Sequence, residues 1–113
     1  MQATTLTQTQ RIKQLNDKLR TTLLGGRVVV TAQIAALPDY QKARVLAAVM
    51  GFTAFNHGND PHDEHDFALI ETVDGAIIFK IDYYDLDLKC HSPDASDPEV
   101  TTRVMTVMFA EEY

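Results

Sequence analysis

The chain has 113 residues, of which 45% are hydrophobic and 23% are charged, the composition of an ordinary globular protein. We predict a single domain over residues 1–113, with residues 1–6 disordered. The single cysteine, Cys90, excludes an internal disulfide and a cysteine-rich zinc module. No run of 18 apolar residues occurs, and the N-terminus lacks the features of a signal peptide. We therefore expect a soluble protein of the cytoplasm that has no membrane contact.

The net charge of −6 is divided unequally along the chain. Residues 1–50 carry seven Lys and Arg and two Asp. Residues 51–113 carry three Lys and Arg and fourteen Asp and Glu, so their net charge is −11. An acidic surface repels nucleic acid and attracts cations or basic protein surfaces. We therefore expect no direct nucleic-acid binding. The alternative is a solvated acidic face that only aids solubility.

The first half of the chain predicts two helices around one strand. Residues 7–24 show isoleucine and leucine at helical spacing and are followed by a glycine pair. Residues 27–34 are rich in β-branched side chains and predict a strand. Residues 38–51 predict the second helix, with a proline in its first turn and a glycine at its end.

Residues 67–82 predict a β-hairpin. Asp74-Gly75 lies between two apolar runs and favours a type I′ turn, which would pair Thr72 with Ile77. The face predicted to line the core carries Ala68, Ile70, Thr72, Ile77, Phe79 and Ile81.

Residues 97–113 predict a last helix, because Asp97-Pro98 is a typical helix start. Its apolar side chains cover more than half of the helix circumference, which places it centrally in the core or at a homodimer interface. The predicted order is α-β-α-β-β-α. This order indicates an α+β fold with a small antiparallel sheet of about three strands, covered by helices on one face.

The loop NHGNDPHDEHDF, residues 56–67, holds three of the four histidines and four carboxylates. Such side chains bind Zn²⁺ or another divalent ion, and the candidate ligands are His62, His65 and Asp66. The spacing matches no established metal motif. The alternative is a loop whose carboxylates cap its own backbone amides.

An acid–base site is a second possibility for the same histidine. His65 would pair with Asp66, or with Asp82 or Asp85 from the next strand, and act as a general base. No convincing nucleophile or phosphate-binding loop accompanies such a pair. The alternative function is therefore a metal-dependent enzyme with a His/Asp site at residues 60–66 and 82–85, whereas the leading prediction is a non-catalytic protein without a cofactor.

The stretch KIDYYDLDL, residues 80–88, mixes tyrosines with aspartates. Aromatic rings with polar tips among acids are typical of a surface that binds a basic protein partner. The alternative is a strand end with one buried tyrosine and solvated acids. The candidate binding residues are Asp60, Glu64, His65, Asp66, Asp82, Tyr83, Tyr84, Asp85 and Asp87.

These motifs, together with NDKLR, GGRVVVT and SPDASDPEVTTRVMTVMFAEEY, resemble a family of small uncharacterised bacterial proteins, a domain of unknown function. The family occurs mainly in alphaproteobacteria and often on plasmids or phages. The likeness runs from about Asn16 to Tyr113, and it carries no assigned activity. Phe79 stands where tryptophan is usual, and His57 lies outside the family pattern. The matching positions are Asn59, Asp60, Pro61, Glu64, His65, Asp66, Phe67, Lys80, Ile81, Asp82, Tyr83, Tyr84, Asp85, Ser92, Pro93, Asp94, Asp97, Thr102, Arg103, Val104, Glu111, Glu112 and Tyr113.

The acidic half and the implied mobile-element habit together suggest a function. A small acidic protein of this kind would occupy the basic groove of a nucleic-acid-handling defence complex, such as a CRISPR effector or a restriction enzyme. The hypothesis is thus an inhibitor that binds a basic surface of a protein partner.

Overall fold

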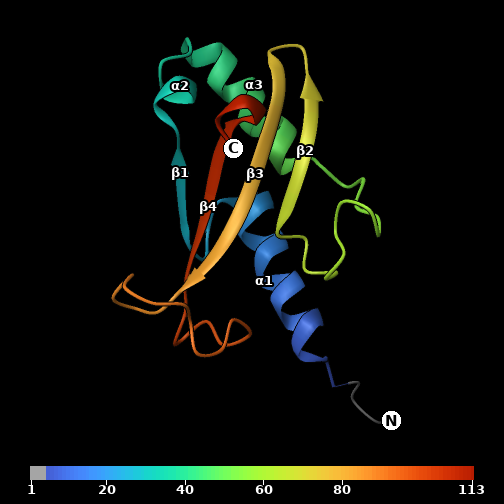
Figure 1. The fold of residues 1–113 in the computed structure, drawn as a ribbon, viewed down its shortest axis with the longest axis vertical. Helices are drawn as coiled ribbons and strands as arrows, with labels where there is room; N and C mark the ends of the chain where they lie inside the picture. The colour runs from blue at the N-terminus through green and yellow to red at the C-terminus, as the bar shows by residue number, and fades with distance from the viewer. Residues whose placement is uncertain (1–4) are drawn as a thin grey trace.

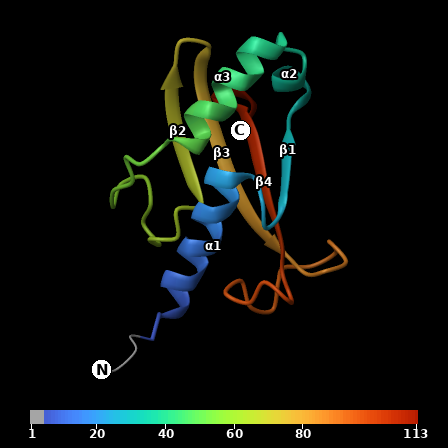
Figure 2. The same ribbon diagram turned by 180° about the vertical axis from the view of Figure 1, so that it is seen from behind.

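The computed structural model describes residues 5–113, so most of the segment predicted to be disordered, residues 1–6, lies outside the described part. A four-stranded sheet in the order β1-β4-β3-β2 carries α1 and α3 on one of its faces (Figures 1 and 2). This arrangement confirms the predicted α+β class. The elements are α1 Gln8–Thr22, β1 Arg27–Val30, α2 Ala32–Ala35, α3 Asp39–Met50, β2 Phe67–Thr72, β3 Gly75–Tyr84, β4 Thr102–Phe109 and the 3-10 helix η1 Ala110–Glu112.

Helix α1 lies within the predicted range of residues 7–24, but it ends before the glycine pair that was predicted to cap it. Thr7 accepts a hydrogen bond from the backbone of Gln10, whose side chain in turn accepts one from the backbone of Thr7, which is a capping box. Leu23 ends the helix in a left-handed conformation, with φ of 62°. The buried face is not purely apolar, because it includes Asn16 and Arg20. These two side chains become important below.

The middle of the chain follows the prediction with one change. Helix α3 has nearly the predicted bounds, but β1 is half as long as expected. The chain leaves the sheet after Val30 and forms the short helix α2, which buries Ile34 completely.

The hairpin of β2 and β3 is confirmed, but its turn was predicted wrongly. Thr72 pairs with Gly75, not with Ile77. A type I′ turn needs a positive φ at both central residues, and neither Val73 nor Asp74 has one; Gly75 takes it instead, at 121°. The register therefore shifts by two residues, which keeps the predicted core face on one side; Ala68, Ile77, Phe79 and Ile81 are buried, and Ile70 and Thr72 are half-buried.

The predicted last helix, residues 97–113, is wrong. Strand β4, Thr102–Phe109, forms the middle of this segment, pairs parallel with β1 and antiparallel with β3, and so lies inside the sheet. Met105 and Met108 point to opposite faces and both are buried. Strand β4 carries apolar side chains on both faces, Met105 and Val107 on one and Val104 and Met108 on the other, so on a helical wheel it resembles a helix apolar on most sides. The sheet consequently has four strands and one parallel pair.

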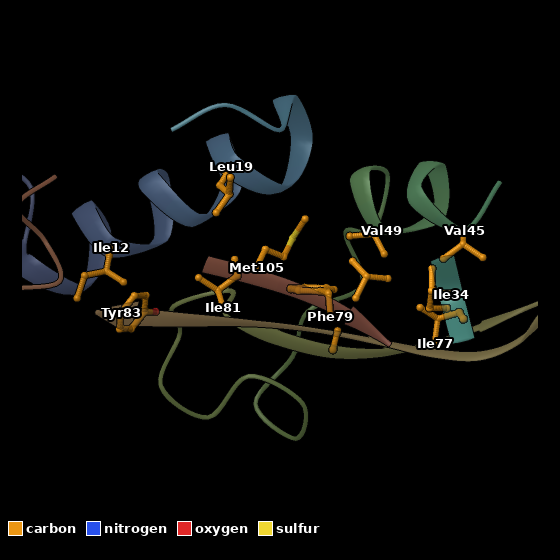
Figure 3. Close-up of a cluster of buried hydrophobic side chains, with 12 residues drawn as sticks. Ile12, Leu19, Ile34, Val45, Val49, Ile77, Phe79, Ile81, Tyr83 and Met105 are labelled. Carbon is orange, nitrogen blue, oxygen red and sulfur yellow. The ribbon is translucent and has the colours of Figure 1, made fainter. Parts of the chain in front are cut away.

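The core lies between the helices and the sheet. Beneath α3, Val45 and Val49 pack over Ile34, Ile77 and Phe79, and all five are fully buried (Figure 3).

Beneath α1, Ile12 and Leu19 pack over Ile81, Tyr83 and Met105 (Figure 3). Within residues 5–113 no α-helix covers the opposite face of the sheet, where Leu69 is 47% exposed. None of the described helices is long and apolar enough to cross a membrane.

Candidate functional site

A buried polar network lies beneath α1, and Asn16 is at its centre. The Asn16 amide nitrogen donates to the hydroxyl of Tyr83 at 2.8 Å and to the backbone carbonyl of Glu64 at 2.9 Å. The Asn16 amide oxygen accepts from Nε of Arg103 at 2.6 Å. Asn16 and Arg103 are 0% and 2% exposed. We call Asn16, Glu64, Tyr83 and Arg103 the polar network.

The polar network fixes the carboxylate of Glu64. Burial raises the pKa of Tyr83, so its hydroxyl stays protonated and donates to Glu64 Oε1 at 2.8 Å. The guanidinium of Arg103 lies 5.0 Å from the centre of the Tyr83 ring, and it also donates to the carbonyl of Ala95. Burial lowers the pKa of Arg103, but an arginine remains charged near neutral pH. The network thus joins α1, the loop before β2, and strands β3 and β4.

His65 is held by α1 and not by the strands. Its Nδ1 lies 2.8 Å from Oδ1 of Asp17, and its ring stacks on Phe55 with the centroids 3.8 Å apart. Asp17 also pairs with Arg20, which donates to three backbone carbonyls at and after the end of α3, including that of Phe52 at 2.7 Å. The predicted pairing of His65 with Asp66, Asp82 or Asp85 is therefore not formed.

Asp60 closes the loop that carries His65. Its side chain is 3% exposed, and Oδ1 accepts from the backbone amides of Glu64 at 3.1 Å and His65 at 3.2 Å. Oδ2 of Asp60 lies 3.7 Å from Nε2 of His65. Asp60 thus caps backbone amides of its own loop and also faces the imidazole.

Asp66 and Asp82 lie apart from His65. Both line a groove of about 410 Å³, and Phe67 and Tyr113 line the same groove. Burial raises the pKa of Asp66, and Asp82 pairs with Lys80 at 2.7 Å.

Tyr84, Asp85 and Asp87 do not join the polar network either. They lie where β3 ends, and Asp85 accepts a hydrogen bond from the backbone of Lys89 at 3.0 Å. Asp87 is exposed and Tyr84 is half-buried. Of the nine candidate residues, the structure brings together Asp60, Glu64, His65 and Tyr83.

Four residues of this site were missed by the sequence reasoning. Asn16, Asp17 and Arg20 were taken for ordinary members of an amphipathic helix, and Arg103 for part of another helix. One signal was present, because Asn16 and Arg20 follow Ile12 at the spacing of the buried face. Their partners lie about 30 to 87 residues away along the chain, so local patterns do not identify them.

A groove of about 550 Å³ opens beside the polar network, between the start of α1 and the loops before β2 and β4. Glu64 and Asp94 supply carboxylates, and Tyr83, His62 and His91 supply rings. Hydrogen bonds from Ser96 hold the pKa of Asp94 below its usual value. No lysine or arginine of the described chain lines this groove, which we call the acidic groove.

The fold and the site define a small α+β protein whose buried polar network supports one wall of an acidic groove. A family model described as "Protein of unknown function (DUF3768)" matches residues 30–112, and the chain belongs to this family. No curated protein and no solved structure matches the chain. The matched span includes Glu64, Tyr83 and Arg103, but Asn16 comes from α1, outside the span.

Proposed function

We propose that this protein is a small non-catalytic binding protein, and that its acidic groove captures a basic segment of a protein partner. The acidic groove carries the proposal, because it combines two carboxylates with aromatic rings and no lysine or arginine among residues 5–113 lines it. An arginine or lysine side chain binds such a site through charge-assisted hydrogen bonds and by lying over an aromatic face.

The Glu64 carboxylate is positioned before a partner arrives. Tyr83 donates to one oxygen, Oε1, so the other remains for an incoming donor. Tyr83 is itself held by Asn16, so the wall of the acidic groove is rigid. A preorganised carboxylate loses less entropy on binding than a mobile one.

Charge around the acidic groove supports the same partner chemistry. The segment between β3 and β4 contributes one wall of the groove and lies at the same end of the molecule as the start of α1 (Figure 1). Residues 85–99 contain five Asp and Glu against one lysine. Their field would steer a basic segment toward the groove.

We extend the proposal to the class of protein to which the partner belongs. An acidic protein that captures arginine or lysine side chains would compete with the phosphate backbone for a nucleic-acid-binding surface. We therefore propose a partner from a nucleic-acid-handling host defence complex, which the protein inhibits by covering its basic surface. The resemblance to proteins of plasmids and phages supports this choice.

A set of arginine- and lysine-containing peptides tests the groove directly. Fluorescence anisotropy would compare the wild-type protein with Glu64→Gln and Asp94→Asn, and with the matched control Glu71→Gln on β2. A charged hydrogen bond is worth about 1.5–3 kcal/mol, so each groove variant should raise Kd about tenfold or more. The control should change it little, because Glu71 does not line the groove.

Two outcomes would contradict the proposal. One is that no basic peptide binds at low salt. The other is an equal loss in Glu71→Gln and Glu64→Gln, since that would reflect net charge and not a site.

A further inference from the structure

A second cavity, formed by the loop before β2, contains side chains that bind transition metals. We propose that Asp60, Asp63 and His65 hold a divalent ion of the Zn²⁺ and Co²⁺ class. One ligand atom from each of the three residues lies within 4.8 Å of the others. Donors around a four-coordinate Zn²⁺ are about 3.3 Å apart, given bond lengths near 2 Å, so the ligand atoms would have to approach one another by up to about 1.5 Å.

The imidazole of His65 is oriented as a metal ligand. Because a carboxylate only accepts, Nδ1–H donates to Asp17 at 2.8 Å, which leaves the lone pair on Nε2. Nε2 faces Asp60 Oδ2 at 3.7 Å, and the stacked ring of Phe55 fixes the imidazole plane. Metal-bound histidines typically donate their second ring nitrogen to a carboxylate in this way. Asp17 is therefore the positioning residue of the site.

The two carboxylates differ in mobility. Asp60 is buried; its Oδ1 accepts from the backbone amides of Glu64 and His65, and its Oδ2 accepts from the amide of His65 at 3.3 Å while facing Nε2 of the same residue, so Oδ2 is the oxygen that would meet the ion. The Asp63 side chain is 67% exposed, and both of its oxygens lie 3.1 Å from Nζ of Lys13. The ammonium group occupies a position that a metal ion would contest. Asp63 is thus the ligand free to move inward, and Lys13 is the competitor.

The cavity around these residues, about 370 Å³ in volume, is also lined by His57 and His62. Neither imidazole belongs to the group of ligand atoms within 4.8 Å of one another, so a fourth protein ligand would require one of them to move. Imidazole with carboxylate suits Zn²⁺ and Co²⁺, whereas Ca²⁺ takes six to eight oxygens. The structure therefore replaces Asp66 of the predicted metal set with Asp60 and Asp63, and returns His57 to the same cavity.

Metal titration of the full-length chain, purified without a histidine tag, tests the site. Co²⁺ binding would be followed by its visible absorption, and Zn²⁺ by calorimetry. We expect one equivalent of either ion and displacement of Co²⁺ by Zn²⁺. Asp63→Asn and His65→Gln should each weaken Zn²⁺ binding at least tenfold, and Asp17→Asn about tenfold. Asp66→Asn is the control and should leave the affinity unchanged.

Lys13→Met should strengthen Zn²⁺ binding, whereas the ligand substitutions should weaken it. The lysine substitution removes the competing cation without touching a ligand, so Zn²⁺ should bind several-fold more tightly. Because Lys13 and Asp63 are at the surface, both variants should fold, and circular dichroism would confirm it.

Three results would overturn the site. They are no Zn²⁺ binding by the wild-type protein at 1 mM, binding that survives both Asp63→Asn and His65→Gln, and Ca²⁺ binding as tight as that of Zn²⁺. None of these measurements uses the acidic groove, so the two proposals fail separately.

Discussion

The layer between the helices and the sheet has two halves of opposite character. Beneath α3 it consists of aliphatic and aromatic side chains such as Val45, Val49 and Ile77. Beneath α1 the same layer contains Asn16 and Arg103, both buried and joined by hydrogen bonds. Only the half beneath α1 holds polar groups in fixed positions at its edge. The two proposed binding sites lie beside that half.

Energetics explain why the two halves must be built differently. The apolar half is stabilised by burial, which is non-directional and tolerates small changes in shape. In the polar half each buried donor and acceptor needs its partner, and an orphaned group costs about 1–3 kcal/mol. The polar half therefore allows fewer arrangements, and this restriction is what holds Glu64 in one position.

The largest effect on stability should come from the apolar half. Ile77→Ala leaves a cavity among fully buried side chains, and we expect a loss of about 3 kcal/mol in the free energy of unfolding, measured by urea denaturation. Val73→Ala is the control, because Val73 is 85% exposed. A loss below about 1 kcal/mol for Ile77→Ala would mean that this half is not close-packed.

Asn16→Leu should destabilise the polar half by about 2 kcal/mol, although the two side chains have similar volumes. The substitution orphans the carbonyl of Glu64 and Nε of Arg103.

A double-mutant cycle with Tyr83→Phe sharpens the test of the polar half. The two residues share a hydrogen bond, so their effects on the free energy of unfolding should not add. Additive losses would show that the polar network does not act as a unit.

Thr7→Ala should cost about 1 kcal/mol, because it removes the capping box of α1. Loosening the start of α1 should also reduce amide-exchange protection in its first turn, while protection in α3 stays unchanged. Thr5→Ala, outside the helix, is the control. Equal loss of protection in α3 would indicate that the two halves unfold together.

The smallest effect should come from Asp66, which lies outside both halves. Burial raises its pKa, so the folded chain holds this proton more tightly than the unfolded chain. The resulting stabilisation is present below about pH 4 and is lost as pH rises through the folded pKa. Asp66→Asn should therefore slightly raise the free energy of unfolding at pH 7 and have little effect at pH 3. A loss of stability at pH 7 would contradict this sign.

Sequence patterns predicted those elements whose character is local. Helix α1 has a cap and a helical period, and the β2–β3 hairpin alternates about a turn containing glycine. Strand β4 was mistaken for a helix because it carries apolar side chains on both faces, which hides the alternation of polar and apolar residues that is typical of a strand. The turn of the hairpin was misplaced for a related reason, since Gly75 accepts positive φ at more than one position of a turn.

The candidate site likewise could be predicted only in part from the sequence. The sequence by itself determined the candidate residues, including Glu64, His65 and Tyr83, because polar and aromatic residues cluster at the ends of predicted strands. Only the tertiary structure decided their partners. Asp17 and Arg103 reach the site from α1 and β4, far along the chain, and packing of α1 on the sheet brings them together. The loop NHGNDPHDEHDF shows both parts: its residue types predicted a polar site, and its folding against α1 brings ligand atoms of Asp60, Asp63 and His65 within 4.8 Å of one another.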